Sequence, residues 1–271
     1  MKNISRELAV RPKKKVKLAD IDPANTLGLQ KAAAATRLAK NLERLSELQY
    51  LLYAEAKRAL LVVLQGIDAG GKDGTIRHVM SGLNPQGVTV TPFKVPEGAE
   101  KRHDYLWRVH NAVPEWGKIG IFNRSHYEDV LVVRVHNLVP KSVWSKRFAQ
   151  INNFEQMLCE NGVRVIKFLL YISKEEQEKR FRERLEDRSK NWKFSPDDLR
   201  EREHWDEYIA AYEDMLHKCS TDWAPWYVIP ANHKWFRNLA VSQIIREELE
   251  GMKLHYPKPA EDLTEEMKKL A

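Results

Sequence analysis

A phosphate-binding loop is the clearest chemical motif in this sequence. Residues 66–72 read Gly-Ile-Asp-Ala-Gly-Gly-Lys and match the pattern G-x-x-x-x-G-K. Glycines let the backbone turn its N–H groups around phosphate oxygens, and the N-terminus of a following helix adds a partial positive charge. The alternative interpretation of this motif is a glycine turn that only ends a strand and binds no phosphate. We expect phosphate to contact Gly66, Ala69, Gly70, Gly71 and Lys72.

Two aspartates accompany the lysine of this loop. The residue after Lys72 is Asp73, where a Ser or Thr hydroxyl ordinarily ligates Mg²⁺. A carboxylate in the first turn of a helix is favoured by the helix dipole, and we interpret Asp73 as such a residue beside the phosphates. Asp68, inside the loop, is the better candidate for Mg²⁺, because an anion in a phosphate cradle is repelled unless a cation lies between them. A local Asx turn is the alternative for Asp68.

A second polar segment covers residues 123–129, Asn-Arg-Ser-His-Tyr-Glu-Asp, and follows another apolar run. The carboxyl ends of parallel strands share one edge of a sheet, so this segment is expected beside the phosphate-binding loop. Arg124 can offer a planar fork of N–H donors to phosphate oxygens. Asn123 stands where many proteins with this loop have Asp, and we expect it near the phosphate or nucleotide.

The rest of this segment has structural explanations as well as functional ones. Ser125 and Glu128 have the spacing of a capping box that opens a helix, although Glu128 is also a candidate for phosphate or nucleotide binding. Asp129 has no capping role, but an acid in a first helical turn is common. His126 is interpreted as structural, because phosphoryl transfer needs positioning and charge rather than a strong base.

A highly charged stretch, residues 174–204, carries ten basic and ten acidic side chains. Arginines recur there every four residues and should share one helix face. We hypothesise a lid that closes over the phosphates and excludes water, with Arg184 as a catalytic residue and with Arg180, Arg188 and Lys193 as phosphate-binding residues. An ordinary salt-bridged surface helix is the alternative. Lys234 and Arg237, near the end of the chain, are weaker candidates for the same rim.

Apolar runs that alternate with amphipathic segments must position these residues. This alternation predicts one doubly wound α/β domain, a five-stranded parallel sheet flanked by helices. The predicted strands are 59–65, 88–93, 118–123, 163–172 and 226–229. The predicted helices are 28–57, from the loop to about 80, 97–113, from Ser125 onward, 141–160, 174–187, 197–218 and 233–250.

Composition sets limits on the class of protein. The chain has 271 residues with 45 Lys and Arg against 38 Asp and Glu, a net charge of +7. This surplus favours an anionic partner, which could be nucleic acid, an acidic membrane or a phosphorylated substrate. Two cysteines, a mean hydropathy of −0.56 and a start without an apolar signal core favour a cytoplasmic protein without a membrane-spanning helix. Residues 1–27 are predicted to be an extended basic arm, and 256–271 a tail.

Four ordered blocks together resemble the polyphosphate kinase 2 family. They are GIDAGGKDGTIRHV, YLWRVH, FNRSHYEDVLVVRV and WYVIPANHKWFRN, within residues 30–255. The resemblance implies a thymidylate-kinase-like P-loop kinase domain over 28–255, with a helical lid at about 174–204, and a homo-oligomer such as a tetramer. Members often carry D-R-S-W-Y-N in the third block, and the version with Asn123 resembles the subgroup that phosphorylates both AMP and ADP.

The resemblance also implies a reaction and the residues that perform it. Polyphosphate donates its terminal phosphoryl group to AMP or ADP with the help of Mg²⁺, reversibly, and guanine nucleotides stay open as acceptors. The matching motifs give Asp68, Lys72, Arg124 and Asp129 as catalytic, with Asp68 holding Mg²⁺ and Asp129 holding metal or orienting the acceptor phosphate. An ATP-dependent nucleoside monophosphate kinase is the first alternative. A nucleic-acid-binding protein that uses the lysines of residues 13–17 is the second, and we expect neither nucleic acid nor a membrane as partner.

Overall fold

The core of the chain is one five-stranded parallel sheet with the strand order β2-β3-β1-β4-β5. The computed structural model describes residues 3–259 and 263–270. Central strand β1 is buried at every position, which explains its continuous apolar run. Its register aligns Leu64 with Asn123 and Gln65 with Leu169, so these strands end at the same edge. The strands are β1 (Ala59–Gln65), β2 (Val88–Pro92), β3 (Ile119–Asn123), β4 (Val163–Tyr171) and β5 (Trp226–Pro230).

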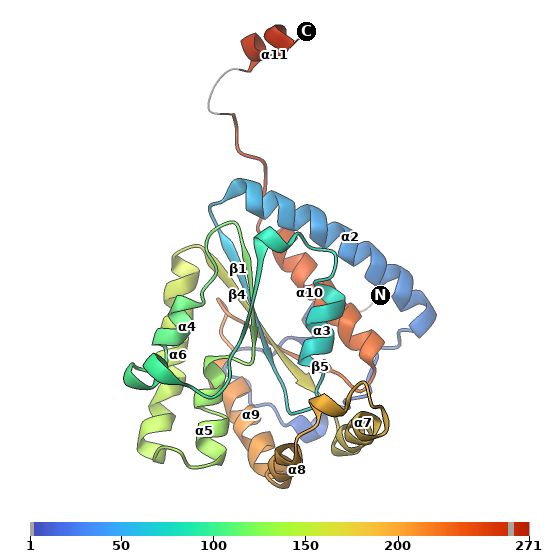
Figure 1. Ribbon diagram of the computed structural model, residues 1–271, viewed down its shortest axis with the longest axis vertical. Helices are drawn as coiled ribbons and strands as arrows, with labels where there is room; N and C mark the ends of the chain where they lie inside the picture. Colours follow the sequence, from blue (N-terminus) through green and yellow to red (C-terminus); the bar gives the residue numbers. More distant parts are fainter. Residues whose placement is uncertain (1–2, 260–262, 271) are drawn as a thin grey trace.

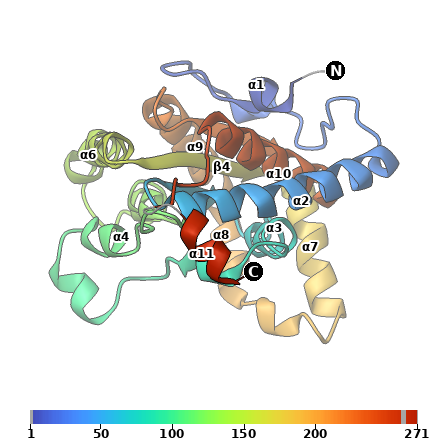
Figure 2. The same cartoon turned by 90° about the horizontal axis from the view of Figure 1, so that it is seen from above.

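Helices cover both faces of this sheet (Figures 1 and 2). Successive side chains of β1 alternate between two apolar cores, with Leu61 and Val63 in one and Leu60 and Val62 in the other. The first core is closed by α4 (Trp107–Asn111), α5 (Val132–Val135), α6 (Lys141–Glu160) and α9 (Trp205–Cys219). The second core is closed by α1 (Ile4–Leu8), α2 (Lys31–Glu55), α3 (Lys72–Val79) and α10 (Lys234–Gly251). The predicted doubly wound α/β architecture is confirmed.

The charged stretch after β4 folds as two helices at the carboxyl edge of the sheet. These are α7 (Lys174–Glu186) and α8 (Pro196–Glu203), with a 3₁₀ turn at Asn191–Lys193 between them. The single helix predicted over 197–218 is wrong, because α8 ends and α9 begins at His204. There the His204 N–H donates to Glu201 three residues back, and this tighter turn redirects the chain so that Trp205 is buried.

The helix predicted over 97–113 is also wrong. Its first part is a 3₁₀ helix, Gly98–Arg102, and α4 begins only at Trp107. Between them the carboxylate of Asp104 accepts a hydrogen bond from the Leu106 N–H at 2.9 Å. An Asp side chain that bonds the backbone two residues on favours a turn over a continuing helix.

The basic arm is not extended at its start. Ile4 and Leu8 of α1 are buried, Leu18 is fully buried, and the Val10 N–H donates to the Trp226 carbonyl at 2.8 Å. These contacts cover the edge strand β5 with a part of the arm that sequence patterning did not identify as apolar. The lysines of residues 13–17 remain exposed. At the other end, the predicted tail contains α11 (Thr264–Leu270). None of the described helices combines the length and the apolar character needed to span a membrane.

Candidate active site

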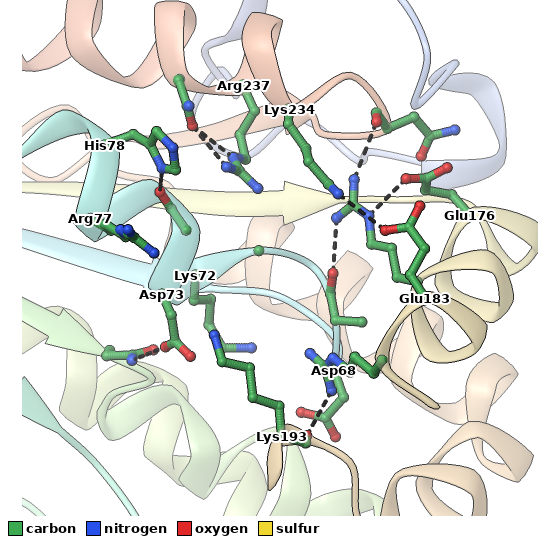
Figure 3. A pocket seen from close by; sticks show the side chains of 18 of the residues that line it. Asp68, Lys72, Asp73, Arg77, His78, Glu176, Glu183, Lys193, Lys234 and Arg237 are labelled. Carbon is green, nitrogen blue, oxygen red and sulfur yellow. Dashed lines mark hydrogen bonds and ion pairs between the residues drawn. The ribbon is translucent and has the colours of Figure 1, made fainter. Parts of the chain in front are cut away.

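A cavity of about 1230 Å³ opens at the carboxyl edge of the sheet. Among the described residues, twelve Lys and Arg but only five carboxylates line it. They come from α2, the phosphate-binding loop, α3, the ends of β2 and β3, the lid and α10, and several point toward one another in Figure 3. Low-dielectric walls that carry one sign of charge concentrate the opposite charge, so this cavity suits polyanions.

The phosphate-binding loop takes the backbone form that the motif predicts. A Cβ on Gly66 would lie 2.8 Å from the carbonyl oxygen of Leu170, so only glycine fits against β4. Gly71 has φ of +102° and ends the loop in the left-handed region directly before α3. Lys72 is buried, and its Nζ donates to the carbonyl of Gly66 at 2.6 Å. Burial and, next, the charge of Arg124 lower the pKa of Lys72 to about 8.

Arg124 connects the loop with the second polar segment. Its guanidinium forms an ion pair with Asp68 at 2.7 Å and lies 3.7 Å from Glu128. Glu128 is therefore not the capping partner of Ser125, and the predicted capping box is wrong. Ser125 does cap, since its hydroxyl accepts from the Tyr127 N–H at 3.1 Å, but the turn that follows is 3₁₀. Burial raises the pKa of Glu128, and Arg124 partly offsets this rise.

Asp73 and Asn123 meet across the cavity floor. The Asn123 amide donates to the Asp73 carboxylate at 2.7 Å, and both residues line the cavity. Asp73 lies in the first turn of α3, as its interpretation as a residue favoured by the helix dipole requires.

Asp129 is directed away from this group. Its carboxylate binds Arg147 at 2.7 Å, and it is not among the residues that line the cavity in the described chain. Burial raises the pKa of Asp129 to about 6, although Arg147 opposes the rise. Neighbouring His126 is buried and binds Glu155 at 3.0 Å, as its structural interpretation predicts.

The lid arginines differ in what they contact. Arg184 lines the cavity, where it pairs with Asp198 at 3.2 Å and donates to the Lys193 carbonyl at 3.1 Å. Lys193 lines the cavity as well, whereas exposed Arg188 is absent from the lining found in the described residues. Arg180 lines the cavity but is buried, and its nitrogens are bound to protein groups.

Two further side chains belong to this site. Arg237 of α10 is buried against the loop, and burial followed by the charge of Arg180 lowers its pKa to about 10. Its guanidinium donates to the side-chain oxygen of Asn238, at 2.8 and 3.1 Å, rather than to a carboxylate. The block that follows β5 had made Arg237 a weak candidate. Gln177 of α7 donates to the Asp68 carbonyl at 3.0 Å and was missed, because one glutamine in a charged run gives no signal.

Comparison with known proteins gives a consistent result. The family model described as "Polyphosphate kinase 2 (PPK2)" matches residues 28–257. An AMP/ADP-polyphosphate phosphotransferase of Meiothermus ruber is 52% identical over 256 residues, covering 94% of this chain and 96% of that protein. An ADP-polyphosphate phosphotransferase of Rhodopseudomonas palustris is 50% identical over 81% of this chain and 80% of its own. The crystal structure of polyphosphate kinase 2 from Arthrobacter aurescens superposes with a TM-score of 0.95 at 43% identity, covering 99% of this chain and 96% of that one.

Proposed function

The chain belongs to the polyphosphate kinase 2 family, and from this membership we propose that it transfers phosphoryl groups between inorganic polyphosphate and AMP or ADP. A phosphate oxygen of the acceptor bonds to the terminal phosphorus of polyphosphate, and the bond from that phosphorus to the bridging oxygen breaks. The products are ADP or ATP and a polyphosphate shorter by one phosphate. The cationic cavity supports this proposal most directly, because both substrates are polyanions that need neutralisation over several phosphates.

The residues that would perform the transfer all line this cavity. Lys72 is the mobile charge of the loop and would leave the Gly66 carbonyl to bind the transferring phosphoryl group. Arg124 lies 2.7 Å from Asp68 and would clamp oxygens at the centre. Arg184 and Lys193 would approach from the lid, and Arg237 would neutralise phosphate at the α3 side. Their work is positioning and charge stabilisation, which supply most of the catalysis in phosphoryl transfer.

Asp68 fits the expected Mg²⁺, whereas Asp129 does not. Mg²⁺ is held in such sites by one or two carboxylates together with substrate phosphates and several waters. The Asp68 carboxylate lines the cavity and is partly exposed beside the loop. Asp68 and Asp129 each pair with an arginine, but Asp129 is not among the described residues that line the cavity, so its predicted role as a metal ligand does not fit. When bound, Mg²⁺ neutralises charge on the phosphate oxygens.

The decisive test supplies polyphosphate with AMP or ADP in the presence of Mg²⁺ and without ATP, followed by chromatography of the products. We expect ADP and ATP, and absence of both would contradict the proposal. A parallel reaction of AMP with ATP alone tests the nucleoside monophosphate kinase alternative. GMP and GDP in the same assay test guanine acceptors.

We also propose a cytoplasmic homo-oligomer, as the resemblance implies. Light scattering after size exclusion gives the assembly mass, and a monomer at assay concentration would contradict this part. Filter binding of DNA and RNA across salt concentrations tests the expectation that nucleic acid is not a partner.

A further inference from the structure

The backbone carbonyl groups of the phosphate-binding loop are turned toward protein donors. Of the six carbonyls of residues 66–71, the first two accept from Lys72 Nζ at 2.6 and 3.4 Å, and the last accepts from the Thr75 hydroxyl at 3.0 Å. The three between them, in residues 68–70, accept from side chains of α7. A carbonyl oxygen that faced the cavity would repel a phosphate, so these contacts bear directly on anion binding.

Arg180 has no N–H group left for a phosphate. A guanidinium carries five N–H donors, and the Nε donor binds Glu176 at 2.7 Å. The other four donate to backbone carbonyls at distances between 2.6 and 3.2 Å, in Ala69, Gly70, Ala231 and Asn232. The expectation that Arg180 binds phosphate therefore disagrees with the structure, in which it joins the loop to the segment after β5.

Gln177 performs the same task one turn earlier on α7. It is buried, and its Nε2 donates to the Asp68 carbonyl at 3.0 Å. Its Oε1 accepts from Arg202 of α8 at 2.8 Å, which fixes the orientation of the amide. Arg202 in turn donates to the Lys174 carbonyl at 2.7 Å, so both helices of the lid are joined to the loop.

We propose that Gln177 and Arg180 are positioning residues for phosphoryl transfer, which hold three loop carbonyls on the α7 side so that the loop N–H groups face the phosphate. In a trans peptide unit the C=O and the following N–H point in opposite directions. Fixing the carbonyls of residues 68–70 therefore fixes the N–H groups of residues 69–71. The Gly70 N–H closes a turn to the Ile67 carbonyl at 2.9 Å, while the N–H groups of Ala69 and Gly71 have no acceptor within the described chain.

This inference rests on the proposed function, in which the loop binds phosphate. The sharpest test is Gln177→Met, which preserves side-chain size and removes the donor without changing charge. Calorimetric titration with inorganic tripolyphosphate, in the absence of acceptor, measures the loop without turnover. We expect the affinity to fall about tenfold, the change that one hydrogen bond supports. The thermal midpoint should fall by only about a few degrees, because the Asp68 carbonyl and Arg202 each lose one partner. The amide resonance of Ala69, whose N–H belongs to the same peptide unit as the Asp68 carbonyl, should shift before any ligand is added.

Arg180→Lys separates positioning from direct contact. A lysine keeps the positive charge but cannot span four carbonyls, so we expect at least a tenfold loss of tripolyphosphate affinity. Arg182→Lys is the matched control, because it makes the same charge-conserving change at an exposed arginine of the same helix, which pairs with Glu178. We expect no change there.

Each outcome decides one statement. A wild-type protein that does not bind tripolyphosphate contradicts the proposed function. Wild-type binding that Gln177→Met leaves unchanged overturns the role of Gln177, and retained binding in Arg180→Lys overturns that of Arg180. If Gln177→Met does not fold, Gln177→Asn keeps the amide and shortens its reach, and the same comparison applies.

Discussion

Arg180 and Arg184 lie one turn apart on α7, yet they belong to regions that are held together in different ways. Arg180 is buried and bonded to backbone carbonyls of the loop and of the segment after β5. Arg184 is more exposed and pairs with Asp198 at 3.2 Å, within the lid itself. The first set of contacts would leave buried polar groups unsatisfied if broken, whereas the second can be exchanged for water or phosphate.

The phosphate-binding loop and the lid differ in the same way in the rest of their contacts. Lid ion pairs such as Arg182 with Glu178 and Lys190 with Asp187 are exposed, and such pairs contribute only about 0–1 kcal/mol each. The end of α7 and the turn after it, which are stabilised in this way, can open and close at little cost in free energy, whereas the start of α7 stays bonded to the loop. The loop, by contrast, is fixed before phosphate arrives. Its N–H groups are preorganised, so little free energy is spent on reorienting them when phosphate binds. A fixed cradle and a movable lid suit a reaction that must exclude water.

The largest effect should come from the loop. Lys72→Met removes the charge that we assign to the transferring phosphoryl group, so we expect turnover to fall by about a thousandfold or more. Initial rates with polyphosphate and ADP measure this. Lys146→Met is the control, because it removes the same single positive charge from an exposed lysine of α6. A decrease below tenfold would remove Lys72 from the chemistry.

The lid should give the next effect. Arg184→Ala is expected to lower kcat by about a hundredfold, because the arginine meets phosphate only when the lid is closed. Its thermal midpoint should fall by about a few degrees below that of Arg182→Ala, because the pair of Arg184 with Asp198 is less exposed than the pair of Arg182 with Glu178. Near-normal turnover would show that the lid acts without Arg184.

The two aspartates that the sequence grouped as metal ligands provide a third contrast. Asp68→Asn should lower kcat/KM by about tenfold or more and raise the Mg²⁺ concentration needed for half-maximal rate. Asp129→Asn should change the rate by a smaller factor, because its carboxylate binds Arg147 outside the cavity. Titration with Mn²⁺, followed by electron paramagnetic resonance, checks binding independently of rate. Equal losses in both measurements would restore Asp129 to the site.

Sequence patterning predicted what depends on local spacing. The apolar run of β1, the glycines of the loop and the alternation of strands and helices determine the fold and bring Asp68, Lys72 and Arg124 to one edge. Sequence patterning could not predict which of several nearby charged partners a side chain binds. Asp129 and Glu128 are adjacent, yet one binds Arg147 and the other faces Arg124.

Contacts between distant segments carried no local signal either. The donation of Gln177 to the loop and the packing of α1 on β5 both join residues far apart in the chain. A periodicity of four residues placed Arg180 and Arg184 on one face of α7. It could not show that α7 contacts the buried loop at Arg180 and the more exposed part of the lid at Arg184. The helix position relative to the sheet decides that difference, and only tertiary structure supplies it.

The smallest effect concerns pH and follows from the buried state of Lys72. A lysine is cationic below its pKa, and here burial lowers that pKa to about 8. If the charged form binds phosphate, kcat/KM of the free enzyme should fall as the pH rises through about 8, by about tenfold per pH unit beyond it. Bound phosphate would stabilise the cation and move the corresponding fall in kcat to higher pH. Arg184→Lys should keep the fall of kcat/KM near pH 8. Lys72→Arg should abolish this fall in whatever activity remains. If kcat/KM of Lys72→Arg still fell near pH 8, the titration would belong to another group, and the loop would be left without its proposed mobile charge.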